Sequence, residues 1–165
     1  MAFQFELEQD FEAPRQEAPD MWVIDIALGY DDVRPVSAVM SVILVQGDSY
    51  LEGAVTNAFD LQFGIRVRRL DSVSKFDFRK ETGVEFIPRE RNKDVLAAIR
   101  RAAISLVSVV RPDHLTMETY YGDLEPKALK KYEDICADLT GIGYEVADAF
   151  KGTLDGINYW YLRRR

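Results

Sequence analysis

The segment from residue 92 to residue 110 places the strongest constraint on the fold. Its apolar residues recur at helical spacing until a proline at position 112, and the second half of this predicted helix is apolar on nearly every side. Such a helix has to be covered by other elements. A chain of 165 residues can bury it within one domain without disulfides or a metal. The apolar positions are Val95, Ile99, Ala102, Leu106 and Val110.

The pattern after this helix predicts the rest of the C-terminal half. Residues 114–121 read as a strand, Asp123 can cap a helix that ends at a glycine pair, and two strands follow at 144–150 and 157–162. A strand–helix–strand step usually forms a parallel crossover, and the last two strands suggest a hairpin. We therefore predict an α+β fold, with a mixed sheet of about five to seven strands, two main helices on one face and a C-terminal β-hairpin. A winged helix–turn–helix is disfavoured, because it normally needs two consecutive helices before the wing.

The N-terminal half is harder to interpret. Residues 3–7 and 21–28 have strand patterns, whereas 36–46 fits either a strand or a helix. We expect a helix over 51–62 that stops at Gly64, a strand over 65–70, and a hairpin over 76–86 that turns at 81–83. Two domain-level regions result: an acidic extended arm over 1–20, and a single α+β domain over 21–165.

Cysteine and histidine are too scarce for several kinds of site. Cys136 is the one cysteine, which excludes an internal disulfide and suits a reducing cytoplasm, and His114 is the one histidine. A usual zinc site needs three or four ligands, so we expect no metal. The P-loop, Rossmann, serine-hydrolase and zincin motifs are absent, and we expect no cofactor. Acidic residues precede the first basic one and no apolar run is long enough to span a bilayer, so we expect no secretory signal and no membrane segment.

The predicted strand 114–121 carries the best candidate for acid–base chemistry. His114, Glu118 and Tyr120 alternate onto one face, where a histidine, a carboxylate and a phenol could work together. The same alternation arises whenever a strand turns its polar side to water. Cys136 lies on the apolar stripe of its predicted helix, which favours a core residue over a nucleophile.

Charge is unevenly distributed along the chain. Residues 1–34 hold nine acidic side chains and two arginines, and residues 66–111 hold twelve basic and six acidic side chains. Bases among aromatic residues can bind single-stranded nucleic acid, but the overall charge of −7 opposes that function. The alternative is that these bases pair with carboxylates elsewhere in the fold. The candidate binding residues are Arg66, Arg68, Arg69, Phe78 and Arg79.

The last predicted strand is the second candidate binding surface. Tyr159 and Tyr161 share one of its faces and Trp160 lies on the other. Aromatic residues on both faces indicate burial on both, either within the sheet or at an interface between proteins, where such residues are enriched.

These observations favour a small acidic cytoplasmic protein-interaction domain without catalytic activity, which acts through a protein partner or as a homodimer and does not enter a membrane. The acidic N-terminal segment supports this hypothesis, because dense carboxylates steer association with basic surfaces. One alternative is a small-ligand-binding protein or enzyme that uses the polar face of strand 114–121. Another is a single-stranded nucleic-acid binder that uses the basic segment 66–80.

Overall fold

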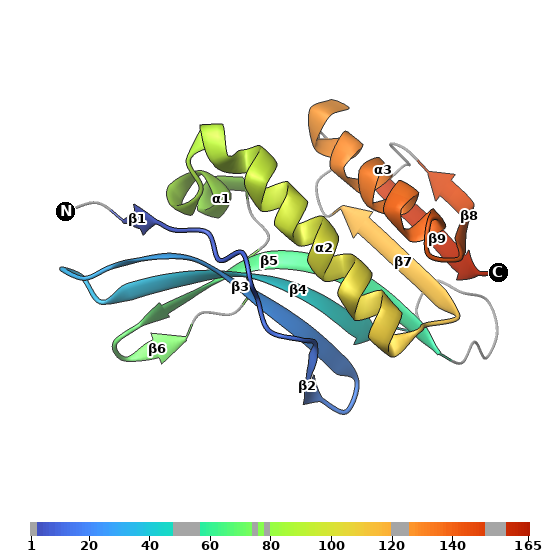
Figure 1. Cartoon of the computed structure of the whole chain (residues 1–165), viewed down its shortest axis with the longest axis horizontal. Helices are drawn as coiled ribbons and strands as arrows, with labels where there is room; N and C mark the ends of the chain where they lie inside the picture. The colour runs from blue at the N-terminus through green and yellow to red at the C-terminus, as the bar shows by residue number, and fades with distance from the viewer. Residues whose placement is uncertain (1–2, 48–56, 74–75, 78–79, 120–125, 151–157) are drawn as a thin grey trace.

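A single mixed sheet organises the molecule (Figure 1). The computed structural model describes residues 3–47, 57–73, 76–77, 80–119, 126–150 and 158–165. The described strands are β1 (Gln4–Phe5), β2 (Arg15–Ala18), β3 (Met21–Asp31), β4 (Val36–Gln46), β5 (Ala58–Arg69), β6 (Ser72–Val73), β7 (His114–Thr119), β8 (Tyr144–Phe150) and β9 (Asn158–Arg164). The described helices are α1 (Lys80–Phe86), α2 (Asn92–Val110) and α3 (Pro126–Thr140), with a 3₁₀ turn at Arg89–Arg91.

The strand order explains why the sheet is mixed. The order is β1-β3-β4-β5-β7-β9-β8, with β2 beside β3 and β6 beside β5. Strands β3, β4 and β5 form an antiparallel meander, and α2 then returns the chain so that β7 runs parallel to β5. Strand β9 pairs antiparallel with both β7 and β8. The α+β class, the mixed sheet and the C-terminal hairpin are confirmed. The sheet has nine described strands rather than five to seven, because β1, β2 and β6 are short additions at its margins.

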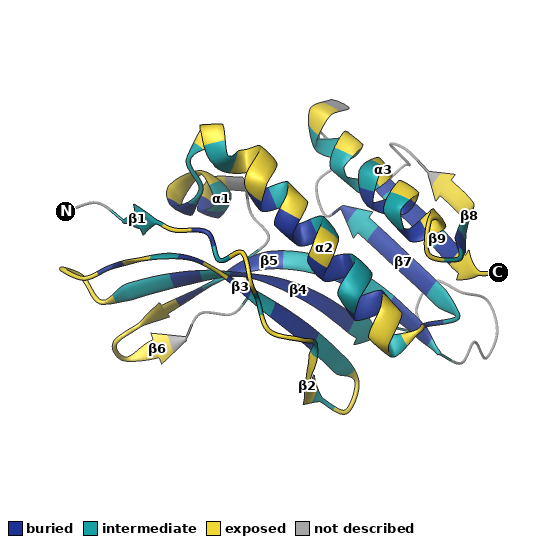
Figure 2. Cartoon of the chain, in the orientation of Figure 1, coloured by how far each residue is buried: buried dark blue, intermediate teal, exposed yellow. Residues whose placement is uncertain are grey.

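Helices α2 and α3 lie on one face of the sheet, as predicted (Figure 1). The buried side of α2 faces the sheet, and its exposed side forms the yellow stripe of Figure 2. The apolar residues of β3, β4 and β5 that alternate toward this layer complete the core, together with Leu115, Met117, Trp160 and Leu162 from β7 and β9. Burial of this sheet face and of the α2 stripe supplies most of the stabilising apolar contact.

Two predictions in the N-terminal half need comment. The ambiguous segment 36–46 is a strand, β4. The helix expected over 51–62 is wrong for its described part, because β5 begins at Ala58 and runs through Gly64, which pairs with Ser41. The residues alternate between apolar and polar from Phe59 to Arg66, a period of two that indicates a strand. Residues 48–56 lie outside the described part of the chain.

The expected hairpin over 76–86 is also wrong, because Lys80–Phe86 forms α1. Thr82 and Phe86 are one helical turn apart and both are buried. The Thr82 hydroxyl donates a hydrogen bond to Asp77 (2.7 Å), and the Phe86 ring meets Phe3 edge-on at a centroid distance of 5.0 Å. Contacts outside the segment, one local with Asp77 and one with the distant Phe3, thus favour the helical conformation.

The acidic N-terminal segment packs on the domain. Its β1 and β2 pair with opposite ends of β3, and between them the amides of Glu6 and Glu8 donate to carbonyls of β3 (2.9 Å each). Leu7 is buried in the main core, and Phe11 packs against that core. Much of residues 3–20 therefore contacts β3 or the core.

Candidate functional site

The sheet has a second face, opposite α2 and α3, which we call the open face. Its side chains come from alternate positions of the central strands, as the register requires. Two polar clusters lie on it, one over β2–β5 and one over β5, β7 and β9. The residues that form them are Arg15, Glu17, Asp25, Ser41 and Arg66 in the first, and Asp60, His114, Thr116, Glu118, Tyr159 and Tyr161 in the second.

His114 and Tyr161 form the central contact of the second cluster. The His114 Nδ1 and the Tyr161 hydroxyl are hydrogen-bonded at 2.7 Å, and the two rings stack at a centroid distance of 5.9 Å with 22° between their planes. They lie on adjacent strands, β7 and β9, where the cross-strand partner of Tyr161 is Thr116. This contact holds an imidazole and a phenol side by side, both half-buried.

Carboxylates surround these rings. Thr116 donates a hydrogen bond to Asp60 of the parallel neighbour β5, and Glu118 is the cross-strand partner of Tyr159. Burial raises the pKa of the Tyr159 phenol to about 12, and the negative charge of Asp60 adds to the shift. Tyr159 therefore stays protonated at every physiological pH and serves as a hydrogen-bonding group rather than a base.

The structure brings two predicted sets of residues together. His114 and Glu118, selected for acid–base chemistry, share the open face with Tyr159 and Tyr161, selected for binding. Tyr120 lies outside the described residues. Trp160 is buried in the core and stacks on Tyr132 at 4.8 Å, so it does not present its ring to a partner.

Asp60 is the member of this cluster that the sequence analysis missed. The sequence predicts a helix at this position, and in a helix the alternation of Asp60 with Phe59 and Leu61 does not place it on a face of the sheet. The period of two from residue 58 onward was the signal that would have placed it on the open face beside Thr116.

The first cluster is a closed network of ion pairs. The Arg66 guanidinium meets Asp25 (3.0 Å) and Glu17 (3.2 Å), and Arg15 also meets Asp25 (2.7 Å). Ser41 donates a further hydrogen bond to Asp25. Burial raises the pKa of the Asp25 carboxyl, but the hydrogen bonds from Ser41 and Arg15 and the charge of Arg66 outweigh it, so the pKa lies below its usual value. The Phe76 ring lies 4.7 Å from the Arg66 guanidinium.

These contacts bear on the predicted basic surface. Arg66 uses two of its nitrogens on carboxylates of the same chain, which is the internal pairing that the sequence analysis offered as an alternative to nucleic-acid binding. Arg68 and Arg69 are exposed at the end of β5. Phe78 and Arg79 lie outside the described residues, so the five candidates are not brought together in the described structure.

The described residues also bear on three other possible functions, namely thiol chemistry, metal binding and membrane insertion. Burial, with the negative charge of Glu133, raises the pKa of the Cys136 thiol to about 12. No group of three or more His, Cys, Asp or Glu side chains in the described ranges could hold a metal ion. Within those same ranges, no helix combines the length and apolar character needed to cross a membrane.

Comparison of the chain with protein-family models, with curated protein sequences and with solved structures finds no match.

Proposed function

We propose that this chain is a protein-interaction domain that binds a partner protein through the open face at β5, β7 and β9. The observation that supports the proposal is the pair of half-buried tyrosines, Tyr159 and Tyr161, beside His114 on the face opposite both main helices. Tyrosine combines a large apolar ring with a hydrogen-bonding hydroxyl and is enriched where proteins bind one another.

The charge of the surface favours a partner of opposite sign. Asp60 and Glu118 flank the tyrosines on β5 and β7, and the exposed Asp148 is the partner of Tyr161 on β8. Arginine and lysine side chains of a partner would complement these carboxylates, and arginine also stacks well on tyrosine. A second copy of this chain would oppose acid with acid at a two-fold interface. A basic partner protein is thus favoured over the homodimer, which is the other form of the hypothesis.

A charge-reversal variant tests this proposal directly. Tagged wild-type protein and the Glu118→Lys variant would be used to capture proteins from host lysate at low salt, with quantitative mass spectrometry. A partner that binds the wild type stoichiometrically and is lost from Glu118→Lys and from Tyr161→Ser supports the open face. Retention of every captured protein by both variants would contradict it.

The matched control is Tyr30→Ser. Tyr30 is an exposed tyrosine on β3, distant in strand order from β9, so its loss should leave the capture unchanged. Light scattering of the wild type, of Tyr161→Ser and of Glu118→Lys would show whether the partner is a second copy. In that case the mass would be twice that of the chain for the wild type and would fall for Tyr161→Ser, whereas Glu118→Lys, which relieves the repulsion between acids, would keep it.

The His114–Tyr161 contact favours a second candidate function, the binding of a small ligand at the same place. A histidine that is stacked and hydrogen-bonded on a sheet is fixed in orientation, as a ligand-binding or acid–base group needs to be. Screening of small metabolites by thermal shift, with wild type and His114→Ala in parallel, separates the two functions. A ligand that stabilises only the wild type would support this second function. If no metabolite stabilises either protein, partner binding is the one function that remains.

A further inference from the structure

Lys131 of α3 is in an unusual place for a lysine. Its ammonium lies on the helix side of the sheet, 5.1 Å from the ring centre of Phe63 on β5 and 5.3 Å from that of Tyr132. Lys131, Phe63 and Tyr132 are all half-buried. We call these three residues the lysine–aromatic niche. It is separate from the open face.

The other charged groups around the niche are engaged with one another. Lys130 meets Asp134 at 2.9 Å, and Arg100 of α2 meets Asp138 at 2.6 Å. Over the described part of the chain, Lys131 makes its two ring contacts and no ion pair. Asp134, which lies one helical turn from Lys131, is therefore directed to Lys130.

A half-buried ammonium without a carboxylate is an incomplete arrangement. Removing an ammonium from water is costly, and folded proteins compensate by pairing it with a negative group. The rings compensate in part, since an aromatic face attracts a cation. Burial nevertheless lowers the pKa of the Lys131 ammonium, so this compensation falls short of full hydration. A negative group from outside the chain would complete the arrangement.

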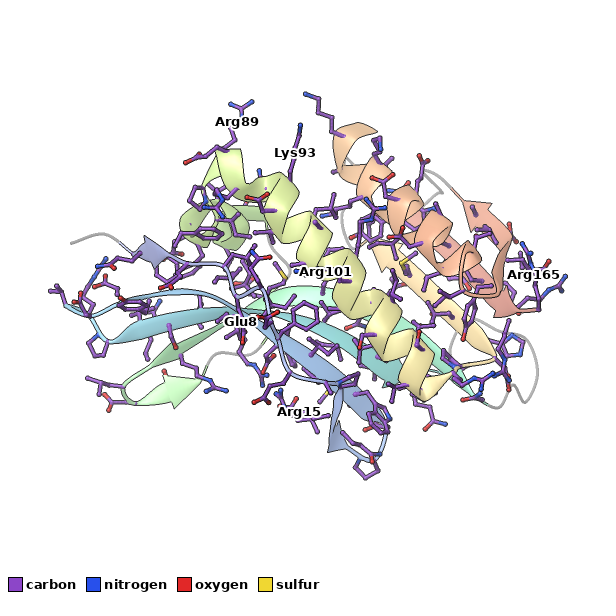
Figure 3. All side chains as sticks on the ribbon, in the orientation of Figure 1. Glu8, Arg15, Arg89, Lys93, Arg101 and Arg165 are labelled. Carbon is purple, nitrogen blue, oxygen red and sulfur yellow. The ribbon has the colours of Figure 1, made fainter. Side chains whose placement is uncertain are left out.

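The walls of the niche indicate what else such a group would carry. Tyr132 tilts over Phe63 at a centroid distance of 5.5 Å and stacks on the buried Trp160 at 4.8 Å. Phe63 and Tyr132 are both half-buried, so a planar apolar body can contact the parts of these rings that Trp160 and the ammonium leave uncovered. The first turn of α3 adds Lys127 and no acid, whereas the charge of Lys130 is balanced by Asp134. By contrast, Arg89 and Lys93 project away from the body of the molecule (Figure 3).

We propose that the lysine–aromatic niche is a binding site for a small aromatic carboxylate. The carboxylate pairs with the Lys131 ammonium, and the ring of the ligand lies against Phe63 and Tyr132. The ligand class follows from the two halves of the niche: a single negative charge to match one ammonium, and an apolar planar body to match the rings.

Benzoate is the probe for this site. Titration of ¹⁵N-labelled protein at pH 7 should shift the amide signals of residues around Phe63 and Tyr132, with saturation in the millimolar range. Benzamide has the ring without the charge, and acetate has the charge without the ring. Both should produce less than a tenth of the benzoate shifts at the same concentration.

Two variants distinguish the site from general anion attraction. Lys131→Met keeps the apolar stem and removes the charge, and it should abolish the benzoate shifts. The same variant should unfold at a higher urea concentration than the wild type, because an uncompensated buried charge is gone. Lys127→Met removes an exposed lysine of the same helix and should change neither measurement. Equal shifts with benzamide and benzoate, or benzoate shifts that persist in Lys131→Met, would overturn the proposal.

Discussion

Arg66 illustrates how one residue can look like a binding group in sequence and be structural in three dimensions. Its side chain is only 12% exposed and lies between Glu17 and Asp25, whereas Arg68, two residues on, is exposed. Alternation along β5 puts both on the open face, so sequence periodicity does not separate them. The difference lies in β2 and β3, which supply carboxylates only at Arg66.

This difference predicts unequal costs of substitution. Arg66→Met leaves Asp25 with Arg15 and Ser41, and leaves Glu17 with the exposed Arg15 only, so it should lower the free energy of unfolding by about 2–4 kcal/mol. Arg68→Met should change it by less than about 0.5 kcal/mol, because the side chain is exposed. Urea unfolding of both variants is the measurement. Equal effects would show that the network does not stabilise the fold.

Asp25 gives the same network a pH dependence. Its pKa in the folded protein lies below the ordinary value, so its contribution to stability is fully present above about pH 4 and is lost as the pH falls through the folded-state pKa. The wild type should thus lose part of its advantage over Asp25→Asn between pH 5 and more acidic solution. Urea midpoints of both proteins at a series of pH values give the difference. A difference that stays constant with pH would contradict this assignment.

Cys136 is predicted to be chemically inert in the folded protein. Burial raises the pKa of its thiol to about 12, and only the thiolate is nucleophilic. A disulfide reagent at pH 8 should leave the native protein unlabelled over the time in which the urea-unfolded protein reacts completely. Rapid labelling of the native state would mean that α3 opens readily from the sheet.

The conformation of residues 80–86, a helix where the sequence predicts a hairpin, can be tested by substitution at Gly83. Gly83 lies inside this helix and a Cβ added there would meet no atom within 4 Å, so Gly83→Ala should stabilise the protein by about 0.5–1 kcal/mol. A tight hairpin turn at the same position would often require a positive φ, and alanine would then destabilise it. Thermal unfolding of Gly83→Ala separates the two conformations.

Gly29 provides the opposite control. Its φ is +139°, and a Cβ there would collide with the carbonyl oxygen of Gln4, where β1 pairs with β3. Gly29→Ala should therefore cost about 1–3 kcal/mol. The two alanine variants should shift the thermal midpoint in opposite directions.

The spacing of apolar residues in the sequence identified the elements that have a long apolar face. It gave α2, α3, β3, β7 and the C-terminal hairpin, because each has a stripe or an alternation that only one conformation buries. It failed at β5 and α1. In β5 a few residues fit both periods, and α1 has seven residues whose conformation depends on Phe3 and Asp77. The candidate site followed the same rule, since His114, Glu118, Tyr159 and Tyr161 were found on well-defined strands and Asp60 was missed on an ambiguous one.

The two faces of the sheet differ in the residues they carry. The helix face holds the main core, whereas the open face carries the charge network, the tyrosine cluster and, beside the charge network, the buried pair Val23 and Ile43. Since β5 contributes Arg66 to one cluster and Asp60 to the other, a single rigid strand fixes the distance between them. The separation allows the surface over β7 and β9 to be altered without disturbing the core.

The N-terminal segment is the part where sequence and structure imply different behaviour of the whole molecule. The sequence predicts an acidic extended arm over 1–20, which could pack on the basic middle of the chain or stay in solvent. An arm that stayed in solvent could be deleted without loss of stability. In the structure, Leu7 is in the core, Phe11 packs against it, Arg101 lies over the Phe11 ring at 5.4 Å, and Glu17 meets Arg66. Deletion of residues 1–20 removes all these contacts at once.

We therefore expect the deletion to lower the free energy of unfolding by about 3 kcal/mol or more. Urea unfolding, followed by both far-UV circular dichroism and tryptophan fluorescence, measures it. The intact chain should give coincident transitions, because β3 joins the segment to the central sheet and the two should unfold together. The control is Glu12→Gln, which changes an exposed acid in the same segment and should leave the midpoint unchanged. An unchanged urea midpoint after deletion would instead establish the segment as an independent arm whose acidic side chains could attract a basic partner.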